Sequence, residues 1–352
     1  MSWCLGWRST TRQCLANFNF IARSFVARIP ATEYRGTLGC GRRPRQGDRF
    51  RMTLRLAVAT EDFGQPLRQA IELAAKNKVQ GLRLNARTEV RAEDFSDTAL
   101  RQLKHYVAEH QLKVAGLMYS SRHAIYDEQH LDQRLDGIRS ALTLVRKLGT
   151  SELLVRIGRI PDPESAAPTA KPDAPKDADV DSLRNPFSFA PASSTLLSAG
   201  ASDSQKFQLL CDILNDLSSF GSHHGAVLQL QFSNFELKRV QQLLSRISAG
   251  TVGIVFDPAS CAMTGSSPVP VFRDLYQNVG YVRLRDAQKD VDGGGIEVPF
   301  GDGNVDWTEL LPTIVEANLR TWVCVERTGG DQRDADVRDA IRRIEQLLPS
   351  PG

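Results

Sequence analysis

The sequence of 352 residues contains no apolar run near the ~18–20 residues that a membrane-spanning helix needs, so we expect no membrane partner. Cysteine is sparse and never forms a Cys-x-x-Cys pair; the six are Cys4, Cys14, Cys40, Cys211, Cys261 and Cys324. Such spacing argues against a zinc knuckle and a disulfide framework, and it favours a reducing cytoplasm. The hydrophobic share of 41% and the charged share of 24% are typical of a globular protein with a large core.

Lysine is absent from the first 51 residues, and acidic residues are scarce there. This segment carries ten arginines against Glu33 and Asp48, a net charge of +8. Because the whole chain carries +3, the remaining 301 residues carry −5. The main part of the chain therefore offers no basic stripe for a nucleic-acid backbone, and we expect no nucleic-acid partner.

Residues 1–51 show no sustained helical or strand period and allow three interpretations. Presequences that target a protein to an organelle are Arg-rich and poor in acids, as this segment is. A disordered basic extension has the same composition. We favour the third interpretation, a translated leader with the true start at Met52, because regular patterning begins directly after that residue. The domain that folds is then expected at 52–352.

From residue 54 onward, short apolar runs alternate with longer amphipathic stretches. Strands are predicted at 54–60, 81–85, 113–119, 152–158, 227–232, 252–257, 280–285 and 321–326. Helices are predicted at 65–76, 97–110, 129–148, 205–221, 236–247, 268–277, 306–317 and 333–348. Eight strand–helix pairs predict an α/β fold, a single (β/α)8 TIM barrel. An open doubly wound sheet is the alternative, but residues 60–64 form no glycine-rich turn after the first strand.

One segment, 161–204, interrupts this alternation between the fourth strand and its helix. It is rich in Pro, Ala, Ser, Asp and Lys and cannot bury enough apolar surface to offset the entropy of ordering. We expect a disordered insertion that leaves the barrel at the C-terminal ends of the strands, where active sites lie. A lid over the site is the alternative.

Polar residues stand at or near the ends of the predicted strands, where barrel enzymes carry their chemistry. Burying polar groups in a barrel is costly unless a partner or ligand satisfies them. The candidates are Asn85, Tyr119, Arg156, Gln229, Gln231, Asp257, Arg283, Asp286 and Glu326.

The second half of the chain resembles a known family. The segments that carry the resemblance are VGIVFDP at 252–258, YVRLRD at 281–286, VPFGDGNVDW at 298–307 and WVCVE at 322–326. They are similar to the xylose isomerase-like TIM barrels, which include the sugar phosphate isomerases and epimerases. The resemblance covers roughly 54–348, is strongest over 225–327, and has VPFGDGNVDW as its most specific match.

The resemblance implies a divalent metal, Mn or Mg, held by Glu, Asp, His and Glu at the ends of strands five to eight. The equivalent positions here carry Gln231, Asp257, Arg283 and Glu326, so two of the four ligands remain. All six histidines lie at or before His224, which leaves none for this site. Because an arginine cannot lose its proton to become a ligand, we expect Arg283 to form an ion-pair network in place of the metal. We assign no cofactor, and a cation bound through oxygens alone is the less favoured alternative.

Several arginines fall near strand ends, and guanidinium groups suit the phosphate or carboxylate of a sugar phosphate or sugar acid. They are Arg156, Arg159, Arg283, Arg285 and Arg327. Salt bridges to Asp257, Asp286 and Glu326 are the structural alternative. The turn at 328–331 stands where many barrels bind phosphate, with a plain turn as its alternative.

Three functions follow from the resemblance. An isomerase or epimerase of a small sugar would use Glu326 or Asp257 as base and Arg283 as electrophile. We expect its substrate to contact Arg156, Gln231, Asn85, Arg285 and Arg327. A non-catalytic descendant that binds a sugar-like ligand or a protein is the alternative, favoured by Gln231 and Arg283. An abasic-site nuclease is disfavoured, because such enzymes need a His-rich multi-metal site and residues 52–352 are acidic.

Overall fold

The computed structural model of this chain describes residues 54–165, 201–233, 235–291 and 294–348. The chain divides into two units after Phe50, and the described residues all belong to the second unit. The predicted extension at 1–51 and positions 166–200 of the predicted insertion lie outside the described residues.

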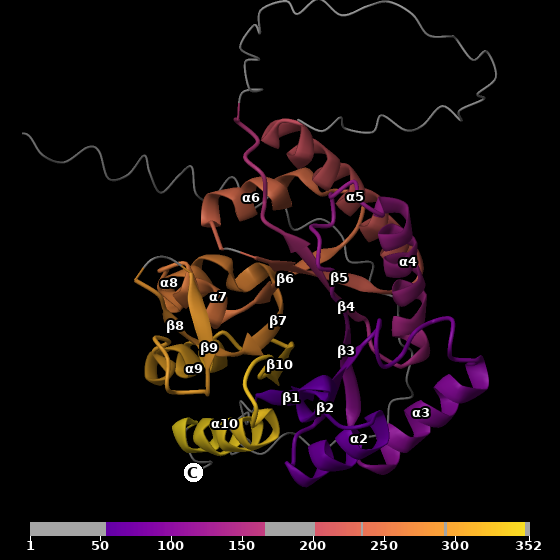
Figure 1. The fold of residues 1–352 in the computed structure, drawn as a ribbon, viewed down its shortest axis with the longest axis vertical. Helices are drawn as coiled ribbons and strands as arrows, with labels where there is room; N and C mark the ends of the chain where they lie inside the picture. Colours follow the sequence, from indigo (N-terminus) through magenta and orange to yellow (C-terminus); the bar gives the residue numbers. More distant parts are fainter. Residues whose placement is uncertain (1–53, 166–200, 234, 292–293, 349–352) are drawn as a thin grey trace, which may run out of the picture. The chain divides into compact units, whose positions relative to one another are not determined.

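Eight parallel strands close into a barrel in the order β1-β10-β7-β6-β5-β4-β3-β2 (Figure 1). Their bounds are β1 Arg55–Ala59, β2 Gly81–Asn85, β3 Lys113–Tyr119, β4 Glu152–Gly158, β5 Val227–Phe232, β6 Val252–Phe256, β7 Val279–Leu284 and β10 Trp322–Val325. Closure comes from β1, which pairs with β2 on one side and with β10 on the other. The TIM barrel predicted from the eight-fold alternation is confirmed.

Helices follow the barrel strands and lie around the outside of the barrel (Figure 1). The helices that correspond to the eight predicted ones are α2 Leu67–Lys76, α3 Asp97–Glu109, α4 Leu131–Lys147, α5 Asp203–His223, α6 Leu237–Arg246, α8 Pro268–Leu275, α9 Trp307–Glu316 and α10 Arg333–Leu347. Their apolar residues share one large core with the outward side chains of the strands. Amphipathic spacing located these helices because each buries one apolar face against the barrel.

Inside the barrel a second, smaller core fills the space between the strands. It consists of Ala57, Ala59, Ala115, Met118, Leu154, Val255, Tyr281, Trp322 and Cys324. Successive residues of a strand point to opposite faces, so these residues fix which positions point inward. The interior of the barrel is packed. The next inward-pointing residues along the strands lie at the C-terminal rim, which is the end of the barrel where the strands finish.

The predictions missed several short elements, and one of these is a 3-10 helix, η1 Thr60–Phe63. A short helix, α7 Pro258–Met263, begins directly after β6, and its N-cap Asp257 accepts from the Ser260 amide at 3.4 Å. An antiparallel hairpin of β8 Asp286–Lys289 and β9 Gly295–Val298 stands between β7 and α9. Its strands have four residues each and carry several polar side chains, so they gave no apolar run to detect.

The two described ends of the interrupted segment contact each other. Arg159, just after β4, pairs with Asp203 at 2.7 Å, and the Asp162 amide donates to the same carboxylate at 3.4 Å. Helix α5 begins at Asp203, inside the predicted segment, with Ser202 and Gln205 forming a capping box. The described residues on either side of 166–200 thus contact each other between β4 and α5.

No helix within the described ranges is long and apolar enough to cross a membrane.

Candidate functional site

Three strand-end residues meet at the C-terminal rim. Arg283 Nε lies 2.7 Å from Glu326 Oε2, and Arg283 Nη1 lies 3.3 Å from Asp257 Oδ2. All three side chains are at most 5% exposed. The guanidinium group therefore bridges both carboxylates, which is the ion-pair arrangement expected in place of a metal.

A second arginine, Arg83 of β2, takes the other oxygen of Glu326. Its Nε lies 3.0 Å from Glu326 Oε1, and its Nη2 lies 2.7 Å from Glu61 Oε1. The side chain is 1% exposed. Sequence analysis missed Arg83, although an arginine on the same strand face as Asn85, between two leucines, was a signal that could have found it.

The network continues from Asp257 toward the β8–β9 hairpin. Arg285 Nη1 lies 2.8 Å from Asp257 Oδ2, and its Nη2 lies 2.8 Å from Glu297 Oε2. Arg327 pairs with Asp336 at 2.9 Å and lies 3.6 Å from Glu297. Glu297 was not predicted because its strand, β9, was not. Salt bridging, the structural alternative for these arginines, thus describes Arg283, Arg285 and Arg327.

The predicted phosphate turn after β10 also meets Glu297. The amide of Thr328 donates to Glu297 Oε1 at 2.7 Å, and the Thr328 hydroxyl donates to the other oxygen. A carboxylate of the protein itself therefore occupies the position at this amide that a phosphate would need.

Charge and burial shift the pKa values of two buried carboxyls, Glu326 and Asp62, in opposite directions. Burial by itself raises the pKa of Glu326, but the guanidinium groups of Arg283 and Arg83 outweigh it and hold this pKa well below its usual range. Burial, and then the charge of Glu326, raise the pKa of Asp62 above its ordinary value. Glu326 therefore stays ionised and is a weak base, because a carboxylate with a low pKa accepts a proton poorly.

The residues at the family's metal-ligand positions do not fit a divalent cation. Both oxygens of Glu326 accept from guanidinium groups, and Asp257 Oδ2 accepts from those of Arg283 and Arg285. Gln231 supplies a neutral amide where the resemblance implies a Glu. In the part of the chain that the structure describes, no three or more His, Cys, Asp or Glu residues form a group able to hold a metal ion. A fixed positive charge, rather than a ligand set, stands at this site.

Polar groups without partners lie on the β4–β5 side of the rim. Arg156 and Gln231 are paired neighbours on adjacent strands and point to the same face. Arg156 is exposed and makes no ion pair or hydrogen bond with another described residue. Gln231 is 9% exposed, and its Oε1 is buried without a hydrogen-bond partner. Nε of Arg285 is likewise buried and unpartnered.

Asn85, another predicted binding residue, is already engaged by the protein. Its Nδ2 donates to Glu61 Oε2 at 2.6 Å, and its Oδ1 accepts from the Arg87 amide at 2.8 Å. It borders a rim hollow of about 540 Å³ that Tyr119 also lines. Of the five predicted contacts, Arg156 and Gln231 have side chains free for a ligand, while Asn85, Arg285 and Arg327 are mainly held in the network.

Asp286, the remaining acidic candidate, has a structural role. Its carboxylate accepts from the amides of Ala287, Gly301, Gly303 and Val305 and from the Trp307 indole at 2.8 Å. It is 1% exposed. The VPFGDGNVDW segment thus wraps around a buried carboxylate and leaves no oxygen for a substrate.

A comparison with models of protein families shows to which family this chain is related. The model of the xylose isomerase-like TIM barrel family matches residues 69–347. The chain belongs to this family.

Individual relatives are distant. An inosose dehydratase of Clostridium botulinum is 24% identical over 104 residues, which span 25% of this chain and 35% of that protein. A xylose isomerase domain protein from Planctomyces limnophilus superposes with a TM-score of 0.62 at 15% identity, covering 79% of this chain and 91% of its own. A 3-keto-D-glucoside 4-epimerase from E. coli superposes with a TM-score of 0.60 at 14% identity, covering 84% and 100%. At such identities the superpositions show the shared fold.

Proposed function

We propose that this protein binds a small anionic sugar, a sugar phosphate or a sugar acid, at the C-terminal rim without the divalent metal of its family. The observation that carries the proposal is the pair formed by Arg156 and Gln231. An unpaired guanidinium group lies beside a buried amide oxygen that lacks a partner. A ligand that carries both an anionic group and a hydroxyl satisfies both residues at once.

Two relatives support a sugar-like ligand. Their names specify an inosose dehydratase and a 3-keto-D-glucoside 4-epimerase. These names support a sugar-like ligand, and the C-terminal rim is where barrels of this kind carry their sites.

The same geometry favours binding over turnover. An isomerase or epimerase needs a base to take a proton next to a carbonyl and an electrophile to hold the enediolate. Arg283 has the charge of an electrophile, but Glu326 and Asp257, the predicted bases, both pair with arginines. Turnover would require one carboxylate to leave its partners, so binding without reaction is the function that the site supports best.

Thermal shift and calorimetry of the full chain test this proposal with three probes: glucose, glucuronate and glucose 6-phosphate. We expect at least one anionic probe to bind, neutral glucose to bind more weakly, and chelator or added Mn²⁺ to change neither result. Substituting Arg156→Gln removes the charge-assisted contact and should weaken binding of the anionic probe by about tenfold or more. Arg101→Gln, on the exposed outer face of α3, is the matched control and should leave binding unchanged.

Two results count against the proposal. One is equal affinity for glucose and the anionic probes, because the arginine would then have no role. The other is exchange of a probe's carbon-bound proton in D₂O, followed by NMR, which would restore the isomerase or epimerase function.

A further inference from the structure

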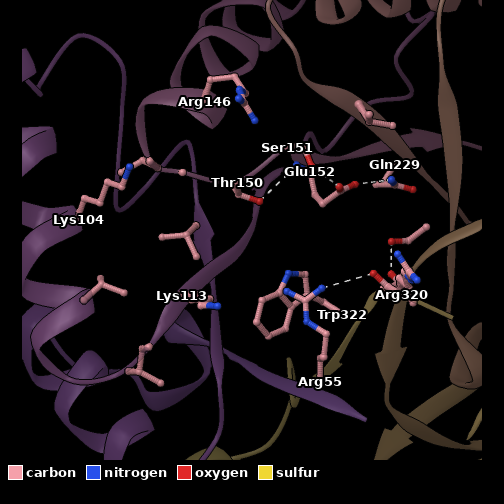
Figure 2. A pocket seen from close by; sticks show the side chains of 18 of the residues that line it. Arg55, Lys104, Lys113, Arg146, Thr150, Ser151, Glu152, Gln229, Arg320 and Trp322 are labelled. Atoms are coloured by element: carbon pink, nitrogen blue, oxygen red, sulfur yellow. Dashed lines mark hydrogen bonds between the residues drawn. The ribbon is translucent and has the colours of Figure 1, made fainter. Parts of the chain in front are cut away.

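A second hollow opens at the opposite end of the barrel, where the strands begin. It has a volume of about 780 Å³. The first residues of several strands line it, among them Arg55 of β1, Lys113 of β3, Glu152 of β4 and Trp322 of β10 (Figure 2). This volume is within the ~300–1,000 Å³ of typical small-molecule pockets.

Positive charge dominates the wall of this N-terminal cavity. Five of its side chains are cationic: Arg55, Lys104, Lys113, Arg146 and Arg320. None of the five forms an ion pair with a described residue, whereas Arg139 and Arg159 elsewhere on the barrel both do. Figure 2 shows the five side chains distributed around the hollow rather than clustered on one wall.

The single acidic residue in the lining does not neutralise these cations. The Glu152 carboxylate accepts from the Ser151 hydroxyl at 2.6 Å and from Gln229 Nε2 at 2.5 Å. Gln229 Oε1, by contrast, is buried and has no hydrogen-bond partner. The cavity therefore combines uncompensated positive charge with one unsatisfied acceptor for a hydroxyl group.

Contacts with aromatic and backbone groups restrain two of the cationic side chains, Arg55 and Lys104. The Arg55 guanidinium lies 3.9 Å above the Trp322 ring, and its Nη1 donates to the Arg320 carbonyl at 3.4 Å. Lys104 packs against Gly149, whose φ of +84° and lack of a Cβ allow the close approach. Side chains fixed in this way lose less entropy when they bind a ligand.

We propose that the N-terminal cavity binds a small polyanion that carries two or more phosphate groups. A concave wall of one charge sign concentrates the field and attracts counter-ions. One guanidinium group can donate two parallel hydrogen bonds to the oxygens of a phosphate, and the lysines add point charges.

The test is calorimetric titration of the full chain with tripolyphosphate at about 0.15 M ionic strength, where exposed charges separated by more than ~8 Å are screened. We expect saturable binding of one tripolyphosphate per chain at the cavity. The double substitution K104Q/R146Q should weaken it by about tenfold or more. The matched control R101Q/R139Q removes the same charge from the same two helices, α3 and α4, outside the cavity, and should retain the binding.

Several outcomes would overturn the proposal. Equal loss in both double variants would show that net charge alone, including the arginines of 1–51, attracts the probe. No binding of tripolyphosphate would exclude the site. Tighter binding of a polyglutamate peptide than of tripolyphosphate would make the surface a protein-docking site instead. Arg156→Gln changes the rim and not the N-terminal cavity, so it should leave tripolyphosphate binding intact. The test of the cavity is therefore independent of the rim proposal.

Discussion

Arg283 changes the chemistry of the rim more than any other single residue. It stands at a position where the family resemblance implies a histidine ligand, and it contributes a charge that no change of pH near neutrality removes. Its guanidinium group contacts Glu326 and Asp257, which are 3% and 1% exposed. Arg283 therefore joins the two carboxylates that remain of the ligand set, each of which also pairs with a second arginine.

Replacing Arg283 by methionine, a residue of similar length, tests how much these pairs stabilise the fold. We expect Arg283→Met to lower the free energy of unfolding by about 3–5 kcal/mol, because buried carboxylates lose a partner while their desolvation cost stays. Urea unfolding followed by circular dichroism measures the change. Arg139→Met, which breaks exposed pairs with Asp136 and Asp216, is the control and should cost under ~1 kcal/mol. A cost below ~1 kcal/mol for Arg283→Met would show that the carboxylates are satisfied without it.

At the scale of single residues, the sequence predicted which side chains lie at the rim better than it predicted which side chains they contact. Strand-end position brought Arg283, Asp257 and Glu326 together correctly, because parallel strands finish at one rim. It did not reveal that Arg83 shares Glu326, since that contact spans 243 positions of sequence. Glu297 was not predicted for a different reason. Its strand, β9, has four residues of mixed polarity and therefore gives no periodic signal.

Among the elements, the β8–β9 hairpin and the loop that follows it carry the family's most specific sequence segment. The loop is held by Asp286, which accepts from backbone amides at Gly301, Gly303 and Val305. A Cβ on Gly303 would clash with the Asp286 carboxylate and with the Ala287 carbonyl oxygen. The glycines of this segment therefore let the backbone close around a buried charge.

Adding one methyl group tests this explanation. Gly303→Ala should lower the free energy of unfolding by about 1–3 kcal/mol, because the loop or the carboxylate must shift to relieve the clash. Thermal or urea unfolding measures the loss. Gly329→Ala is the control, because the nearest atom to its added Cβ lies 3.9 Å away, and it should change stability by no more than ~0.5 kcal/mol. Equal effects of the two substitutions would contradict the explanation.

The eight strand–helix pairs were predictable because each helix buries one apolar face and each barrel strand is a short apolar run. The missed helix and hairpin follow strands directly and consist of short elements, although α7 buries four of its six residues. Helix α7 has six residues, too few to show a helical period. Prediction from pattern therefore found the long periodic elements and missed the short ones that shape the C-terminal rim.

At the scale of the whole molecule, closure of the barrel determines which residues are needed to complete the sheet. Strand β1 begins at Arg55, and both of its edges are already paired with β2 and β10. No barrel edge is left for residues 1–51 to complete. We therefore expect a chain of residues 52–352 to unfold cooperatively at the midpoint temperature of the full chain, within about 2 °C, a shift that corresponds to about 1 kcal/mol. Differential scanning calorimetry of both chains makes the comparison, and removing ten arginines with two acids should also lower the isoelectric point.

A large drop in the midpoint, or loss of the cooperative transition, would show that the barrel depends on the segment before Met52, and the leader interpretation would then be wrong.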